Sequence, residues 1–247
     1  MTDDADGGTH TDVDYKDLLF NLMHELRSIN NIIKSSSEIL SKSIRGEKLD
    51  RDSIEYHTNQ IIENSNMLSL WLNVTEFETN PTFFETQRLE PRSLFGKFKK
   101  AEISFRRIAK NKKVVIRISG DSKTLIETYP VIDLLPYLLL DNAIKYSPNS
   151  GSVSIHFDES STSIEIVVLS VGPTLKAEEE EQIFEKGFRG ERASQVNPQG
   201  SGRGLALAKK IADIHDAEIG VKIGKTQYVF NGTPHSEFSV LLKFPKR

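Results

Sequence analysis

The sequence predicts an α+β protein in which an N-terminal helical hairpin forms a dimeric four-helix bundle and is followed by an α/β sandwich. Apolar residues recur at intervals of three and four in the first third of the chain. A polar stretch with two prolines then interrupts this pattern, and helix-like and strand-like segments alternate after it. With 247 residues, the chain is long enough for two domains.

The composition excludes several classes of protein. The chain has 37% hydrophobic and 27% charged residues, which is ordinary for a soluble globular protein. Its net charge of −3 gives no reason to expect nucleic-acid binding. It has no cysteine, which rules out disulfides and thiolate chemistry and fits a cytoplasmic location. No apolar stretch is long enough to cross a bilayer, so we expect no membrane insertion.

The N-terminal third predicts a disordered acidic tail over residues 1–12 and a helical hairpin over residues 13–79. The first helix carries a heptad seam with one polar position, and the second carries a similar apolar stripe. The seam consists of Leu19, Leu22, Leu26, Ile29, Ile33, Ser36 and Leu40, and the stripe of Ile54, Ile61, Leu68 and Trp71. One hairpin buries little surface, so we expect two copies to associate as a homodimer.

An exposed histidine is predicted on the first helix, since His24 falls opposite the heptad seam. On position alone, a surface histidine without a function is the simpler interpretation. The neighbouring residues favour chemistry, because the Glu25 carboxylate can hold the imidazole tautomer or take its proton. Ser28 lies one helical turn further along, on the same side as His24.

Residues 80–92 are predicted to be a linker, and residues 93–247 a second domain of mixed helices and strands. The helices are expected at about residues 92–110, 131–146 and 204–216. The strands are expected at residues 113–118, 152–157, 164–170, 218–223 and 237–244. Elements in this order indicate a sheet covered by helices.

Polar residues at the end of the predicted helix 131–146 form the first group with chemical potential. The spacing of Asn142, Lys145 and Tyr146 places them on one helical face. An amide oxygen can ligate Mg²⁺, a lysine can meet a phosphate, and a tyrosine ring can lie against a base. The alternative is an ordinary polar helix end before a proline.

A glycine-rich segment forms the second group, with Gly200, Gly202 and Gly204 followed by Leu205 at the start of the predicted helix 204–216. Glycines let the backbone approach an anion, and a helix N-terminus presents free N–H groups. A third segment leaves a strand at Ser170 and Gly172 and runs through a long loop that contains Arg189. An arginine there can contact phosphates or belong to a solvated loop.

Together these residues resemble two parts of sensor histidine kinases. The run His24-Glu25-Leu26-Arg27-Ser28 resembles their phosphoacceptor box, although Ile29 stands where the family has a proline. The later segments resemble the asparagine, glycine and phenylalanine boxes of the GHKL ATPases, a superfamily that also contains topoisomerases, chaperones and repair proteins. The resemblance implies an ATP site under a lid at about residues 172–202.

The resemblance also implies a mechanism and a set of partners. His24 would be phosphorylated from ATP-Mg, with Glu25 orienting the imidazole and Asn142 holding the metal. The phosphoryl group would pass to an aspartate on a response-regulator receiver domain, and the residue at the Ser28 position helps to reverse that transfer in the family. We see no sensor segment in this sequence, so the input would come from a separate sensor protein or from a longer chain.

One departure from the family pattern leaves alternatives open. Ser170 stands where the family has an aspartate that binds the adenine amino group, and Thr174 replaces a glycine. These changes favour a degenerate phosphotransfer or scaffold protein with weak ATP binding, whereas Asn142, Lys145 and the three glycines from Gly200 to Gly204 favour an active kinase, which remains the preferred interpretation. A further alternative, an ATPase-gated clamp of the topoisomerase or chaperone type, is disfavoured by the short hairpin with its exposed histidine.

Overall fold

The computed structural model describes residue 23 and residues 26–27, 29–42, 50–80, 87–198, 200 and 202–246. The chain divides into two compact units, Met1–Asn80 and Pro81–Arg247. The predicted phosphoacceptor residues His24, Glu25 and Ser28 lie outside the described residues. No helix within the described ranges combines the length and the apolar character that a membrane crossing requires.

The first unit contains helical residues 29–42 and the helix α2 (Arg51–Thr79). The predicted seam is visible in the burial of two of its positions, since Ile29 and Ser36 are both buried. The buried Ser36 hydroxyl has a partner on α2, because its Oγ lies 3.4 Å from Nδ1 of His57. The polar seam position therefore links the two helices of the hairpin. A four-helix bundle needs a second chain and stays a prediction.

The second unit is built on a five-stranded sheet with the strand order β2-β4-β5-β7-β6. Its strands are β2 (Val115–Ser119), β4 (Ser152–Glu159), β5 (Ser163–Pro173), β6 (Glu218–Phe230) and β7 (Thr233–Pro245). Strands β2 and β4 are parallel, and the other neighbours are antiparallel. Strand β5 lies at the centre of the sheet, but its pairing with β4 ends at Ser170, and residues 171–173 pair with β7.

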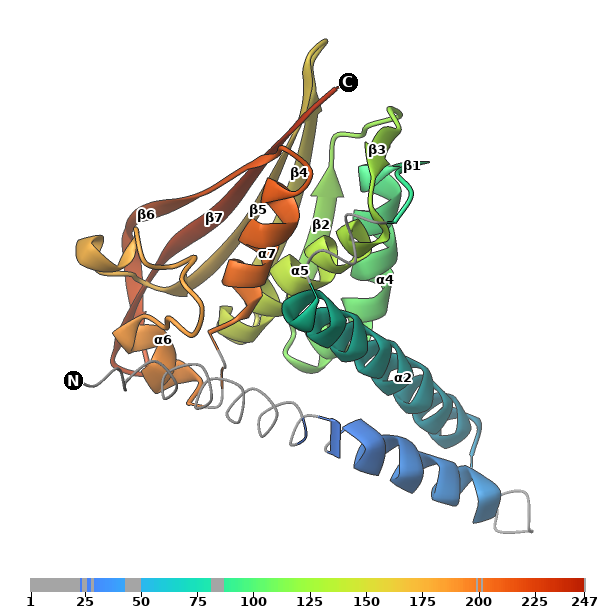
Figure 1. Cartoon of the computed structure of the whole chain (residues 1–247). Coiled ribbons are helices and arrows are strands. Elements are labelled where there is room, and N and C mark those ends of the chain that lie inside the picture. Colours follow the sequence, from blue (N-terminus) through green and yellow to red (C-terminus); the bar gives the residue numbers. More distant parts are fainter. Residues whose placement is uncertain are drawn as a thin grey trace, which may run out of the picture. The chain divides into compact units, whose positions relative to one another are not determined.

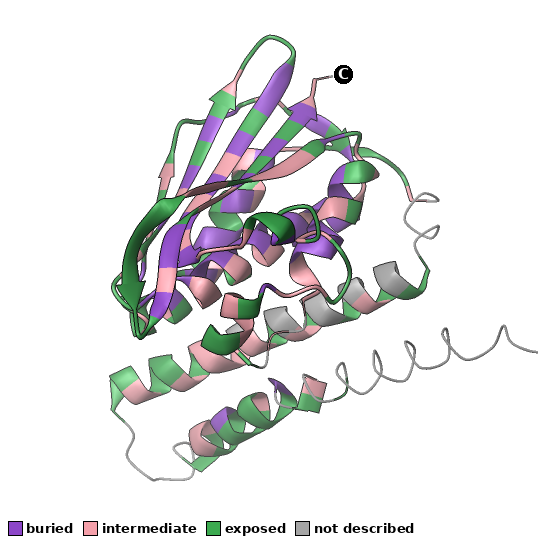
Figure 2. Cartoon of the chain, turned by 90° about the vertical axis from the view of Figure 1, so that its left-hand side faces the viewer, coloured by how far each residue is buried: buried purple, intermediate pink, exposed green. Residues whose placement is uncertain are grey.

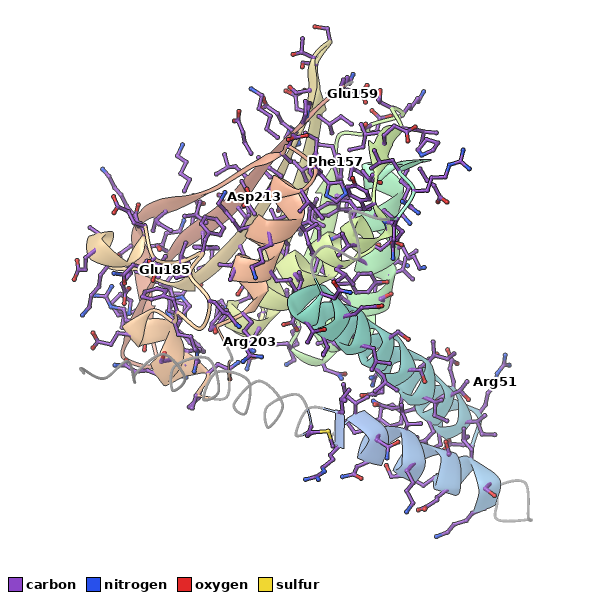
Figure 3. The ribbon with its side chains drawn as sticks, in the orientation of Figure 1. Arg51, Phe157, Glu159, Glu185, Arg203 and Asp213 are labelled. Atoms are coloured by element: carbon purple, nitrogen blue, oxygen red, sulfur yellow. The ribbon has the colours of Figure 1, made fainter. Side chains whose placement is uncertain are left out.

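Three helices cover one face of this sheet (Figure 1). They are α4 (Leu94–Asn111), α5 (Leu134–Tyr146) and α7 (Gly204–Asp213). The burial pattern alternates along β4, where Val153, Ile155 and Phe157 are buried and their neighbours are less so (Figure 2). Phe157 points from β4 toward α4, with its ring centroid 5.4 Å from that of Phe98 (Figure 3). The sequence prediction of a sheet covered by helices is confirmed.

The structure differs from the sequence prediction at the edges of the elements. A two-stranded sheet pairs β1 (Glu90–Arg92) with β3 (Ile126–Thr128), and β1 falls within the stretch that was expected to be a linker. Strands β6 and β7 are longer than expected and meet at a tight turn. Its central residues Asn231 and Gly232 have φ of 48° and 78°, as a type I′ turn requires. Hydrophobic patterning missed this extension because most of the additional residues are polar or exposed.

Candidate functional site

The predicted site residues of α5 lie at its C-terminal end. The helix places Leu135, Leu139 and Leu140 in the core, because apolar residues fill one broad side of its sequence. Asn142, Lys145 and Tyr146 are half-buried on the remaining side. The buried leucines therefore fix the helix on the sheet and leave the amide, the amine and the phenol near the surface.

The end of α5 is held by a lysine that sequence reasoning did not single out. Lys112 donates from Nζ to the carbonyl oxygens of Ile144 at 2.9 Å and Lys145 at 2.8 Å. The last carbonyls of a helix lack partners within the helix, so this ammonium supplies the missing donors. Burial lowers the pKa of Lys112. The lysine fixes the backbone from which Lys145 and Tyr146 project.

The end of β5 lies next to this part of α5. A Cβ added to Gly172 would lie 3.6 Å from the Cβ of Tyr146, so the strand and the helix are in close contact there. Ser170 is 5% exposed and pairs in register with Phe238 on β7. Ser236 is also buried and pairs with Gly172, whereas Thr233 pairs with Phe230 at the β6–β7 turn. The hydroxyl of Ser236 therefore lies beside β5, whereas that of Thr233 lies at the turn.

The segment after β5 also contacts Tyr146. A Cβ on Gly200 would lie 3.0 Å from the Tyr146 hydroxyl oxygen and 3.0 Å from Nη2 of Arg189. Any larger residue at this position would displace one of the two side chains. The structure therefore brings Tyr146, Gly172, Arg189 and Gly200 together from α5, β5 and the loop before α7.

The other two glycines shape the approach to α7. Gly202 has φ of +68°, and a Cβ there would lie 2.6 Å from the carbonyl oxygen of Phe188, so this position requires glycine. Its own carbonyl accepts a hydrogen bond of 3.1 Å from the backbone N–H of Gly187. A Cβ on Gly204, the first residue of α7, would meet nothing within 4 Å. Leu205 is buried and anchors the first turn of that helix.

The arginines of the loop have partners on its backbone. Arg189 donates from Nη1 to the carbonyl of Pro198 at 3.0 Å and from Nη2 to that of Asn197. Its Nε is buried and has no hydrogen-bond partner among the described residues. Arg203 lies just before α7, and Glu185 lies within the loop (Figure 3). The Arg189 guanidinium therefore already orders the loop through these backbone bonds. Its contact with a phosphate stays a prediction.

The candidate nucleotide site needs no preformed metal cage. Among the described residues, no three histidines, aspartates or glutamates gather in a way that could hold a metal ion. The half-buried Asn142 amide offers one oxygen ligand. Mg²⁺ usually keeps several waters and is bound through one or two protein ligands together with the phosphates of its nucleotide. A single half-buried amide suits that mode of binding.

Comparisons with known proteins identify the type of domain. Residues 137–246 match the family described as histidine kinase-, DNA gyrase B-, and HSP90-like ATPase. The sensor-like histidine kinase SenX3 of Mycobacterium tuberculosis is 37% identical over 106 residues. This alignment covers 43% of the present chain and 24% of SenX3, so the chain corresponds to a minor part of that relative.

Two solved structures share the fold. Full-length ShkA in complex with AMPPNP gives a TM-score of 0.54 at 17% identity, covering 94% of this chain and 46% of ShkA. Histidine kinase ThkA in complex with the response regulator TrrA gives a TM-score of 0.50 at 17% identity, covering 90% of this chain and 59% of that one. At such low identity, the likeness concerns the fold alone.

Proposed function

Because the chain belongs, through its ATPase domain, to the sensor histidine kinases, we propose that it phosphorylates its own His24 from ATP. The phosphoryl group then passes to an aspartate on a response-regulator receiver domain, and the active form is a homodimer. The complex of ThkA with a response regulator supports this kind of partner. The AMPPNP complex of ShkA supports a nucleotide as the ligand.

The observation that carries the proposal is the convergence of Tyr146, Gly172 and Gly200. Two glycines from separate segments approach one tyrosine, and a side chain on Gly200 would push against the ends of Tyr146 and Arg189. Such close backbone approaches are typical of sites that bind phosphates or a base. Tyr146 would lie against the base, Lys145 would meet a phosphate, and the Asn142 amide would hold Mg²⁺. ATP supplies the phosphoryl group when it is bound.

The chemistry at the hairpin follows from the residues around His24. A neutral imidazole nitrogen is a good nucleophile, and Glu25 would keep it in the reactive tautomer or take its proton. The enzyme's main contribution to phosphoryl transfer is positioning and the neutralisation of charge. Ser28 would place a hydroxyl one helical turn away, where it can contact a phosphoryl oxygen or a water molecule.

A second candidate is a degenerate member that binds ATP weakly and serves as a phosphotransfer or scaffold protein. The buried, uncharged Ser170 favours it, because the family has an aspartate there. Loss of a charge-assisted hydrogen bond to the base would weaken binding about ten- to hundredfold. The neighbouring Ser236 and Phe238 are also uncharged, so neither replaces the carboxylate.

Incubation of the purified protein with γ-labelled ATP and Mg²⁺ tests the proposal. We expect an acid-labile, base-stable label on the wild type and none on His24→Ala or Asn142→Ala. His156→Ala, which removes an exposed histidine of β4, should keep the label and serves as the matched control. An unlabelled wild type that also binds no ATP in a titration would favour the degenerate protein. A phosphorylated receiver domain could then be tested as the donor to His24.

A further inference from the structure

The segment between β5 and α7 is folded around one buried carboxylate. Glu179 belongs to a run of four glutamates, residues 178–181, but it alone is buried, with 8% of its surface exposed. Its Oε2 accepts a hydrogen bond of 2.8 Å from the backbone N–H of Lys176, and its Oε1 accepts one of 2.8 Å from that of Glu191. One side chain thus joins two backbone positions that are 15 residues apart.

Additional contacts close the same loop. The Lys176 ammonium pairs with the Glu191 carboxylate, which raises the pKa of the lysine and lowers that of the glutamate. Arg192 donates from Nη1 to the Thr174 carbonyl at 2.9 Å, so the start of α6 (Glu191–Val196) is attached to the end of β5. The backbone N–H of Thr174 in turn donates to the carbonyl of Pro234 at 2.9 Å.

The packing beside Glu179 leaves no spare space. Gly190 is buried, and a Cβ there would lie 2.8 Å from Cδ2 of Leu175 and 3.2 Å from Oε2 of Glu179. Gly190 directly follows Arg189, whose guanidinium holds the backbone two to three residues before Gly200. The Glu179 contacts therefore set the place of Arg189 and, through it, of the glycine that approaches Tyr146.

We propose that Glu179 is a positioning residue that folds the loop between β5 and α7 before a nucleotide arrives. The inference rests on the proposed function, since the segment lies against Tyr146, a residue of the proposed ATP site, at Gly200. Ordering a loop during binding lowers affinity, because the conformational entropy is lost at that moment. A loop that is already ordered avoids this loss, and apparent affinity rises in proportion to the fraction of molecules in the competent state. Glu179 thus acts on ATP binding without touching the nucleotide.

Glu179→Gln is the informative substitution. Glutamine keeps the shape of the side chain, but it has one acceptor oxygen and one NH₂ group, which cannot accept from a backbone N–H. Only one of the two bonds survives. Glu180→Gln, at an exposed carboxylate one residue along the chain, is the matched control. Glu179→Asp keeps the charge but is one methylene shorter, so we expect it to retain one bond and to fall between the wild type and Glu179→Gln.

The test combines hydrogen exchange on the nucleotide-free protein with ATP titration and autophosphorylation kinetics. For Glu179→Gln, we expect exchange at the amides of Lys176 and Glu191 to be about tenfold faster and the Kd and KM for ATP to rise about tenfold. We expect kcat at saturating ATP to change by less than about twofold, because bound nucleotide still orders the loop. Glu180→Gln should match the wild type in each measurement.

Two results would overturn the inference in different ways. If the wild type binds ATP but Glu179→Gln leaves its Kd unchanged, or lowers kcat and leaves KM unchanged, Glu179 does not position the loop for binding. If the wild type binds no ATP, the proposed function fails and the positioning role falls with it. The exchange rates separate these cases, since they report on the Glu179 bonds without any nucleotide.

Discussion

The two sides of the proposed nucleotide site are held together by different forces. On one side, α5 rests on the sheet through leucines such as Leu135, Leu139 and Leu140, which are almost fully buried. On the other side, the described residues of the loop between β5 and α7 include no buried apolar residue from 174 to 198. The loop is ordered by Glu179, Arg189 and Arg192, each bonded to the backbone. In Figure 2, buried residues (purple) lie on the helices and strands, whereas the loop is mostly exposed (green) or intermediate (pink).

The difference between apolar burial and polar contacts predicts which side of the site unfolds with the whole domain and which side opens locally. Apolar burial contributes about 25 cal/mol per Å² and is lost only when the whole domain opens, so the α5 side should unfold with the domain. A loop held by a few polar contacts opens locally at much lower free energy. Substitutions in α5 should therefore change global unfolding, whereas substitutions in the loop should change local opening and nucleotide affinity.

The largest effect is expected from Leu139→Ala on the α5 side. Leu139 is 1% exposed, and its truncation removes buried surface and leaves a cavity. We expect the free energy of unfolding to fall by about 2–5 kcal/mol in urea denaturation. Leu125→Ala, at a leucine that is 56% exposed, should change it by less than about 0.5 kcal/mol. Equal effects for the two variants would contradict the view that α5 anchors the cooperative core.

An intermediate effect is expected from His215→Ala, which breaks a polar contact within the scaffold. His215 accepts a hydrogen bond at Nε2 from the backbone N–H of Tyr129 at 3.0 Å and donates from Nδ1 to the Ile211 carbonyl at 2.6 Å. The substitution leaves both backbone groups without these partners, at a loss of about 1–3 kcal/mol. Urea denaturation at pH 8 should measure this loss.

The same histidine should also make stability depend on pH. Burial lowers the pKa of His215 from its ordinary value of 6.5, so the folded state favours the neutral ring. The unfolded chain then binds more protons near this pH, and stability is full above about pH 6.5 and falls as the pH drops below it. His215→Ala should flatten this fall, and His156→Ala on β4 should leave it in place. A wild type whose stability does not change between pH 8 and pH 5.5 would refute the assignment.

The sequence predicted the scaffold better than the contacts that finish the site. The order of helices and strands and the buried side of α5 follow from local patterns, whereas the closeness of the Gly200 segment to Tyr146 was implied only by the family resemblance. Lys112 could not be found in this way, because its partners Ile144 and Lys145 are more than thirty residues away and are backbone carbonyls, which leave no mark in a sequence. Glu179 was hidden in a run of four similar residues, from which only the folded loop selects one for burial.

The smallest effect on global stability is expected from Arg192→Met in the loop. Methionine keeps much of the length and apolar character but cannot donate to the Thr174 carbonyl, which lies 2.9 Å from Arg192. That carbonyl belongs to a half-buried residue and can be hydrated, so unfolding should change by less than about 0.5 kcal/mol. The amide of Ser194, which donates to the Gly190 carbonyl in α6, should exchange about fivefold faster. Arg117→Met, at an exposed arginine of β2, is the control and should alter neither quantity. A fall in global stability as large as that of Leu139→Ala would mean that the loop unfolds with the core, and the contrast between the two sides of the site would then be wrong.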